Sequence, residues 1–304
     1  MTLNLKQLET FVFVADLGSF SKAAARLNTT QPNISLRITA LETALDTALM
    51  DRDAGSVRLT AKGRELLAYA RRVLRATDDL MVASENAAIF DGVLRLGVTE
   101  MVVHTWLDDF LKRIASAFPA LAVELTVDLS VTLDHDLATR ALDLAFQSGP
   151  FDHQASGNED LGTYPLGWVA APSVAAMLGH GFSLDDLLAF PILTHARNTR
   201  PYADVQRHVR QAGRLLPRLI PSNNLAACMR MTVQGMGVAT LLDAMVAPEV
   251  ESGALVRLAY PWVPEPLTFH ARYDAERAPR YVAIAAGLAR DAAVEFVAAY
   301  KTGK

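Results

Sequence analysis

The side chains best suited to recognition chemistry lie near the amino terminus, in the segment SKAAARLNTTQPNISLRI, residues 21–38. Its second half presents Gln31, Asn33, Ser35 and Arg37 within two helical turns. Gln and Asn can pair through two hydrogen bonds with adenine edges, and Arg favours guanine or phosphate. The segment therefore predicts contact with base edges and phosphates in a DNA major groove. The alternative is a solvated pair of helices with no ligand.

Three short helices would hold these side chains in place. Apolar residues at three- and four-residue intervals predict an amphipathic helix over 5–17, ended by Gly18. Ser21 is expected to cap a second helix and Thr30 a third, whose first turn tolerates Pro32. Alanines at the second helix allow the close crossing that a helix-turn-helix requires, and Leu and Ile residues anchor it from beneath.

A turn with a short strand follows at 51–60, and Thr60 is expected to cap a long helix over about 61–88. Along that helix apolar or small residues repeat every seven positions, at Leu66, Val73, Leu80 and Ala87. A sustained seven-residue repeat predicts a partner helix, most simply from a second copy of the chain.

Strands and helices alternate from residue 93 onward, which is typical of parallel sheets with crossover helices. The pattern restarts after residues 162–164, and the last strand, PLTFHARY, precedes a closing helix over 279–299. This predicts two α/β lobes, with ligands bound at the carboxyl ends of the strands, in the cleft between lobes.

Composition agrees with a multidomain globular protein of 304 residues, 51% of them hydrophobic. Residues 1–75 hold 11 Lys/Arg and 7 Asp/Glu, whereas residues 91–304 hold 18 Lys/Arg and 23 Asp/Glu. The amino-terminal part is therefore net positive and the remainder net negative. A single cysteine, Cys228, suits a reducing cytoplasm, and a buried structural thiol is the expectation for it. No apolar run is long enough to span a membrane, and no export signal is evident.

The order of these motifs resembles the winged helix-turn-helix of LysR-type transcriptional regulators. The matching stretches are L-x-x-L-x-x-F, G-S-F-S-x-A-A-x-x-L, T-Q-P-x-I-S-x-x-I-x-x-L-E and V-R-L-T-x-x-G, beginning at Leu5, Gly18, Thr30 and Val57. The resemblance implies an α/β protein with an N-terminal all-α winged helix-turn-helix and a two-lobed effector domain like periplasmic binding proteins. The expected domains are 1–60 for DNA binding, 61–90 for the linker and dimerisation helix, and 91–304 for effector binding, with lobe I at 91–162 and 267–304 and lobe II at 163–266.

The resemblance also implies what the chain does. It predicts a cytoplasmic transcriptional regulator, not an enzyme, that binds double-stranded DNA at paired half-sites. Homodimers through the linker helices, commonly assembled as tetramers, are expected, with RNA polymerase as a further candidate partner and no membrane association. A small-molecule effector would alter DNA bending and transcription, and no cofactor is expected beside it.

Roles in DNA binding carry over to matching positions of the helix-turn-helix and wing. They are Ser21, Thr30, Gln31, Pro32, Asn33, Ser35, Arg37, Arg52 and Arg58. Family members often have a small residue in place of Asn33 and a basic one in place of Leu36, and the wing here carries Asp51 and Asp53. These departures leave the half-site preference open.

Effector contacts are expected where strands end and where loops cross between lobes. The candidates are Thr99, Ser130, Thr194, Arg197, Asn198, Arg200 and Asn224, with Gln147 and Ser148 as weaker ones. Hydroxyls, helix-start N–H groups and an arginine would hold a carboxylate. For the hydroxyls the alternative is local helix capping. Because few aromatic residues fall at the cleft, a small polar organic acid or amino acid is the predicted effector.

Other chemistry finds little support in the sequence. Asp134, His135 and Asp136 resemble a metal or acid–base cluster, but a solvated helix start is the expectation because neighbouring helix residues point different ways. The histidines have no metal-binding spacing, so no metal site is predicted. An α/β enzyme with a helical dimerisation arm would need a nucleophile and base, which no motif supplies. A solute-binding protein would need an export signal.

Overall fold

The computed structural model shows two compact units. The first is Met1–Gly92 with the short segments Phe118–Ala120 and Glu276–Ala283, and the second contains the remaining residues. Each unit buries its own cluster of apolar side chains. The structure describes four stretches of sequence: 3–51, 57–83, 92–215 and 218–302.

Three helices open the first unit: α1 (Leu5–Leu17), α2 (Phe20–Arg26) and α3 (Gln31–Leu45). As predicted, α1 ends at Gly18, whose φ of 59° suits a residue without a Cβ. The cap predicted at Ser21 is wrong, because Ser19 has the extended backbone of a cap and its side chain accepts from the Lys22 N–H at 3.3 Å. Thr30 is the N-cap residue of α3, although its side chain makes no capping hydrogen bond.

The core of this unit lies beneath α2 and α3. Ala23 and Ala24 are buried where these helices cross, and Ile34 and Ile38 are fully buried below them. A hairpin of β1 (Met50–Asp51) and β2 (Arg58–Leu59) follows, then the long helix α4 (Ala61–Ala83). The Thr60 hydroxyl accepts from the Gly63 N–H at 2.8 Å, so the predicted cap of this helix is confirmed.

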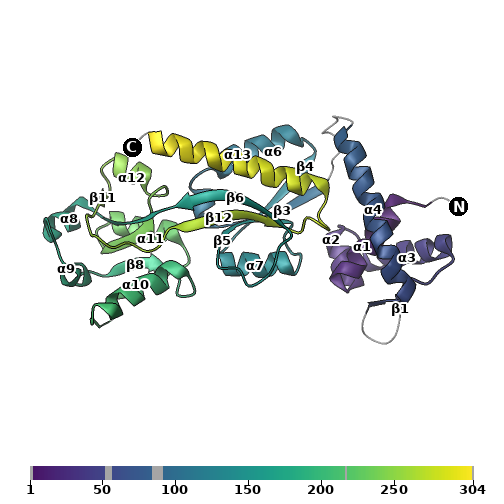
Figure 1. The fold of residues 1–304 in the computed structure, drawn as a ribbon, viewed down its shortest axis with the longest axis horizontal. Coiled ribbons are helices and arrows are strands. Elements are labelled where there is room, and N and C mark those ends of the chain that lie inside the picture. The colour runs from purple at the N-terminus through teal and green to yellow at the C-terminus, as the bar shows by residue number, and fades with distance from the viewer. Residues whose placement is uncertain (1–2, 52–56, 84–91, 216–217, 303–304) are drawn as a thin grey trace. The chain divides into compact units, whose positions relative to one another are not determined.

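The second unit contains two five-stranded sheets (Figure 1). The first sheet has the order β4-β3-β5-β12-β6. Figure 1 shows α13 along one face of it and α7 on the other. Its elements are β3 (Gly92–Val98), α5 (Glu100–Val103), α6 (Leu107–Ala117), β4 (Leu121–Val127), α7 (Ser130–Ala138), β5 (Leu144–Ser148), β6 (Gly157–Tyr164), β12 (Leu267–Tyr273) and α13 (Arg280–Thr302).

The second sheet has the order β11-β7-β10-β8-β9. Cys228 lies on α11, fully buried against this sheet, as predicted. The elements are β7 (Leu166–Ala170), α8 (Pro172–Leu178), α9 (Leu184–Leu188), β8 (Ile192–His195), α10 (Arg200–Gln211), β9 (Leu219–Ser222), α11 (Leu225–Val233), β10 (Val238–Leu242), α12 (Ala247–Glu251) and β11 (Val256–Arg257).

The sheets are mixed rather than purely parallel. β3 pairs with β5 and β8 with β9 in parallel, as the alternating pattern predicts. β12, the strand by which the chain returns from the second lobe, runs antiparallel to both β5 and β6, and within the second sheet β10 runs antiparallel to β7. None of the helices in the described residues has both the length and the apolar character to cross a lipid bilayer.

Candidate functional site

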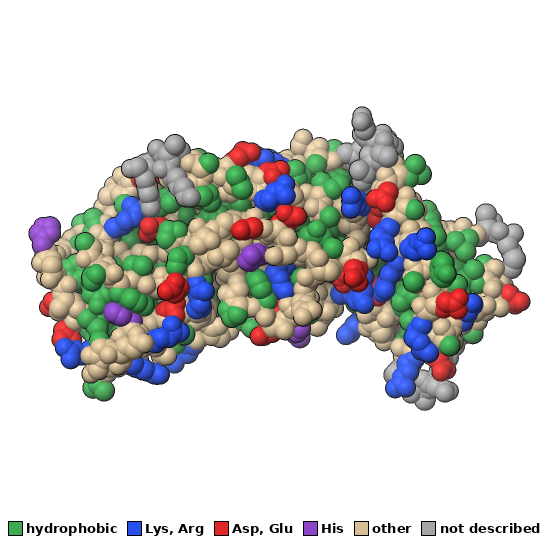
Figure 2. All heavy atoms as spheres, viewed as in Figure 1, with side chains coloured by type: hydrophobic (Ala, Val, Ile, Leu, Met, Phe, Trp, Pro, Cys, Tyr) green, Lys and Arg blue, Asp and Glu red, His purple; other side chains and the backbone are tan. Residues whose placement is uncertain are grey.

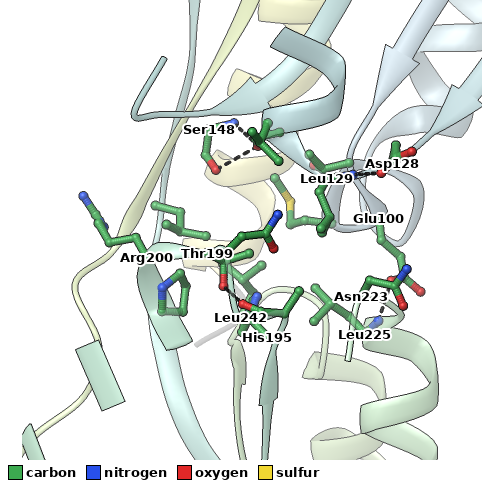
Figure 3. A pocket seen from close by; sticks show the side chains of 18 of the residues that line it. Glu100, Asp128, Leu129, Ser148, His195, Thr199, Arg200, Asn223, Leu225 and Leu242 are labelled. Atoms are coloured by element: carbon green, nitrogen blue, oxygen red, sulfur yellow. Dashed lines mark hydrogen bonds between the residues drawn. The ribbon is translucent and has the colours of Figure 1, made fainter. Parts of the chain in front are cut away.

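A pocket of about 630 Å³ lies between the two sheets of the second unit (Figure 3). The first sheet contributes residues at or just after the ends of β3, β4 and β5, and the second contributes residues at or just after the ends of β8, β9 and β10. The carboxyl ends of these strands meet there, where α/β sheets bind ligands. The predicted position of the site is therefore where the pocket forms.

Six of the nine predicted ligand residues line this pocket. They are Thr99, Ser130, Ser148, Asn198, Arg200 and Asn224. Thr99 is the N-cap residue of α5, yet its side chain makes no capping bond, and its Oγ1 is buried with no hydrogen-bond partner among the described residues. Local capping thus does not account for this hydroxyl, which is free to contact a ligand.

Local hydrogen bonds do account for two other side chains of this set. The Asn224 side chain caps α11 by accepting from the Ala227 N–H at 2.6 Å. The Ser130 hydroxyl accepts from the Ser148 N–H at 3.1 Å and lies 3.3 Å from the Ser148 hydroxyl. The pair fixes the end of β5 against the start of α7 and leaves both hydroxyls at the pocket wall.

Gln147, Thr194 and Arg197 do not line the pocket. Side chains alternate between the faces of a strand, so the next residue on each strand points to the pocket instead. Thr194 is fully buried and lies 3.0 Å, Oγ1 to Oγ1, from Thr240 on β10. Gln147 is also fully buried, whereas Ser148 and His195 line the pocket. Arg197 is exposed outside it.

Glu100 is the main lining residue that the sequence analysis missed. It lies on α5 of the first lobe, and its carboxylate accepts from the backbone N–H of Leu225 and, at 2.9 Å, from that of Ala226. These are the first residues of α11 in the second lobe. The carboxylate occupies the positive end of that helix and joins the lobes, as Figure 3 shows for Glu100 and Leu225. Its position two residues after the end of β3, where ligand contacts were expected, is the sequence feature that could have identified it.

Charges of both signs border the pocket. Glu100, Asp128 and Asp152 supply carboxylates, and Arg200 supplies a guanidinium. Arg200 donates to the Pro266 carbonyl, and Figure 3 shows its side chain on the side of the pocket opposite Glu100. The arrangement can hold a ligand that carries opposite charges at its two ends.

His195 forms a neutral part of the pocket wall. Burial lowers the pKa of its imidazole to about 4, and its Nε2 has no hydrogen-bond partner among the described residues. A neutral imidazole can donate or accept one hydrogen bond at that atom, depending on the tautomer. Like Thr99, it offers an unpaired buried group to a polar ligand.

The buried His195 is expected to make the second unit less stable in acid. The unfolded chain binds a proton at His195 near pH 6.5 and the folded chain only near pH 4, so stability is lost as pH falls below about 6.5. The expected loss between pH 7 and pH 5 is about 2 kcal/mol. Urea unfolding at both pH values checks this, with His195→Gln as the comparison. An equal pH dependence in that variant would contradict it.

A buried ion pair supports one rim of the pocket. Asp134 and Arg272 are 3% and 5% exposed, and the guanidinium donates to the Asp134 carboxylate. The same carboxylate accepts from the N–H groups of Asp152 and His153 at 2.9 and 3.0 Å, and lies 2.9 Å from His153 Nδ1. The prediction of a solvated helix start is therefore wrong for Asp134, since Arg272 comes from a distant strand.

The predicted DNA-binding residues gather at the start of α3. Gln31, Pro32 and Asn33 are exposed, and Thr30 precedes them. The Ser21 hydroxyl donates to Gln31 Oε1 at 3.0 Å, which ties α2 to α3, and Asn33 Nδ2 donates to the Thr29 hydroxyl at 3.3 Å. The helix-turn-helix thus presents a polar helix start on its surface.

The remaining predicted contacts differ in placement. Arg37 is half-buried, and its guanidinium donates to the buried Thr10 hydroxyl at 3.4 Å, so it turns toward α1. Ser35 is half-buried, and Arg58 on β2 is exposed. Arg52 lies outside the described residues. On the face drawn in Figure 2, Lys and Arg side chains gather over α4.

Two family models match the chain. The model "Bacterial regulatory helix-turn-helix protein, lysR family" matches residues 5–64, and "LysR substrate binding domain" matches residues 88–293. The second match alone covers more than half of the chain.

Two relatives are similar to this chain over most of its length. The chain is 28% identical over 244 residues to the HTH-type transcriptional regulator CzcR of Bacillus cereus, covering 80% of this chain and 82% of CzcR. It is 30% identical over 264 residues to the SDS degradation transcriptional activation protein of a Pseudomonas species, covering 84% of each.

The fold also matches a solved full-length structure. LysG of Corynebacterium glutamicum, solved with bound effector Arg, superposes with a TM-score of 0.61 at 21% identity, covering 96% of this chain and 99% of LysG. Family members are transcriptional regulators, which excludes the enzyme alternative, and the predicted fold class is confirmed. The chain belongs to the LysR family of transcriptional regulators, with a DNA-binding helix-turn-helix domain followed by an effector-binding domain.

Proposed function

We propose that this regulator responds to an amino acid or a similarly small polar organic acid bound between its two lobes. The observation that carries the proposal is a pocket of about 630 Å³ with unpaired buried polar groups on Thr99 and His195 and charges of both signs at its border. A flat aromatic ligand would leave these polar groups unsatisfied. The arginine bound to LysG supports an amino acid.

In this proposal each end of the effector has its own partners. Arg200, with Asn198 beside it, would hold a carboxylate, and the carboxylates of Glu100 and Asp128 would face an ammonium group. The Thr99 hydroxyl would contact the centre of the ligand. Because these residues come from both lobes, an effector that touches all of them changes how tightly the lobes close.

A thermal-shift panel tests this effector class. We expect the melting temperature to rise with one or more amino acids at millimolar concentration, and the shift to be lost in Thr99→Val, which keeps the side-chain shape and removes the hydroxyl. Thr105→Val is the matched control, since among the described residues the Thr105 hydroxyl hydrogen-bonds only to Met101 and Val102, in the turn that ends α5. A shift with an uncharged aromatic and none with any amino or organic acid would refute the proposal.

Paired copies of the chain would present two reading helices to DNA. α4 supports this pairing, since it exposes Tyr69, Val73 and Leu80 at 55%, 43% and 70%. We infer three domains, at 1–60, 61–90 and 91–304. The chain would form dimers through α4, and these dimers would assemble into tetramers. At the promoter, the regulator would contact RNA polymerase. DNA binding also supports a cytoplasmic location.

Substitutions in the helix-turn-helix should separate base reading from phosphate binding. We expect Gln31→Ala to cost about 1–3 kcal/mol of binding free energy and to relax base preference. Arg58→Ala should weaken binding to all duplexes alike and reduce the salt dependence by about one unit of slope. Gel shifts at several salt concentrations, on DNA from upstream of the protein's own gene and on scrambled duplexes, measure both. Equal effects of both changes on every duplex would argue against base reading by α3.

A further inference from the structure

The centre of the exposed face of α3 is apolar. Ile34, Ile38 and Leu41 form the buried face of this helix. Residues spaced four apart share a helix face, and the face opposite the buried one contains Pro32 and Leu36. Leu36 is 69% exposed, more than any other large hydrophobic side chain in the described part of residues 1–60.

Three of the polar side chains near Leu36 on α3 each make a hydrogen bond within the domain. Gln31 accepts from Ser21, Asn33 donates to Thr29, and Arg37 turns away to Thr10. The Arg37 guanidinium, the one charged group of residues 31–37, is therefore directed away from Leu36. Leu36 can approach the base edges in a DNA major groove with no charged side chain of this segment between them. A leucine has no donor or acceptor, so it can discriminate between bases only by apolar contact.

The major groove offers one such contact. The C5 methyl group of thymine is the apolar group among the edges of the four bases there. Leu36 lies just beyond the first turn of the second helix of a helix-turn-helix, and the amino-terminal part of that helix is the part that meets base edges. We propose that Leu36 is a specificity-determining residue that selects thymine, through its methyl group, in each half-site. This proposal rests on the DNA binding of the proposed function.

Duplexes made with deoxyuridine test this contact directly. Deoxyuridine lacks only the methyl group of thymidine, so hydrogen bonding and charge are unchanged. The probe is a duplex from upstream of the protein's own gene, prepared with dTTP or with dUTP, at low ionic strength. We expect the full-length protein to bind the deoxyuridine duplex about fourfold more weakly for one methyl contact, and more than tenfold where both copies of Leu36 make one.

Variants isolate the role of Leu36 from other effects of deoxyuridine on the duplex. Leu36→Ala should bind both duplexes with nearly equal affinity, whereas Leu36→Met should keep the preference for thymine. Leu5→Ala, at the other exposed helical leucine of this domain, should behave as wild type. An equal loss with deoxyuridine in wild type and Leu36→Ala, or no loss in wild type, would overturn the proposal. Failure to bind either duplex would overturn the proposed DNA-binding function as well.

Discussion

Asp134→Ala is expected to lower the free energy of unfolding of the second unit by about 3–5 kcal/mol, since it leaves the buried Arg272 guanidinium without its carboxylate. It also removes the acceptor for the N–H groups of Asp152 and His153. The loop of these residues borders the effector pocket, so effector affinity should fall too. Urea unfolding and ligand titration measure the two effects.

The matched control is Asp136→Ala on the same helix, because the Asp136 side chain has no ion pair within the described residues. A second variant, Asp134→Leu with Arg272→Met, tests the physical cause. Removing both charges should recover much of the lost stability, since an unpaired buried charge costs more than an absent pair. Equal destabilisation in Asp134→Ala and Asp136→Ala would contradict the role of the ion pair.

The Asp134 carboxylate also makes the stability of the second unit depend on pH. Burial alone would raise the pKa of Asp134, but hydrogen bonds from His153 and Arg272 outweigh it and hold the pKa below its ordinary value. The unfolded chain then takes up this proton first as pH falls. The stabilisation is therefore complete above the ordinary pKa of an aspartate and lost as pH falls through the lower, folded value.

Glu100→Ala is expected to have the second-largest effect, a loss of about 2–3 kcal/mol in the stability of the effector domain. The change removes a carboxylate that accepts from Leu225 and Ala226 across the two lobes and leaves both N–H groups without it. Glu100→Gln should lose less, because one oxygen remains as an acceptor. Thermal unfolding of both variants, with the exposed Glu251→Ala on α12 as control, gives the comparison.

Glu100 should also set which charge the effector carries. The Glu100 carboxylate already occupies the amino end of α11, so it repels a ligand carboxylate from that end of the helix. In Glu100→Gln we expect weaker binding of amino acids and stronger binding of simple carboxylic acids, measured by calorimetry. Unchanged preference between the two classes would mean that Glu100 joins the lobes without selecting the ligand.

Local sequence patterns were sufficient to predict the helix-turn-helix and most strands. Caps, glycine stops and apolar spacing act over a few residues, so α1, α3 and α4 begin near their predicted positions. β6 was missed because its sequence, GNEDLGTY, is largely polar, and it is a strand at the edge of its sheet. β9 (LIPS) was also missed, because it contains a proline, which is tolerated in a strand at the edge of a sheet.

The site was predicted to within one residue along two strands. Gln147 and Ser148 were both predicted and only Ser148 lines the pocket, and Thr194 was predicted where His195 lines it, because a short strand does not reveal from sequence alone which of its two faces reaches the cleft. The environment of Asp134 could not be predicted, because Arg272 lies 138 residues away along the chain. Glu100 depends in the same way on helix α11, 125 residues further on.

The most direct test of a ligand-responsive DNA-binding regulator is fluorescence anisotropy with a labelled duplex from upstream of the protein's own gene. The account predicts binding that weakens steeply with salt, and an amino acid or related acid that changes the affinity by about fivefold or more in wild type but not in Thr99→Val. Protein that is folded yet shows no affinity for duplex DNA at low ionic strength would contradict it.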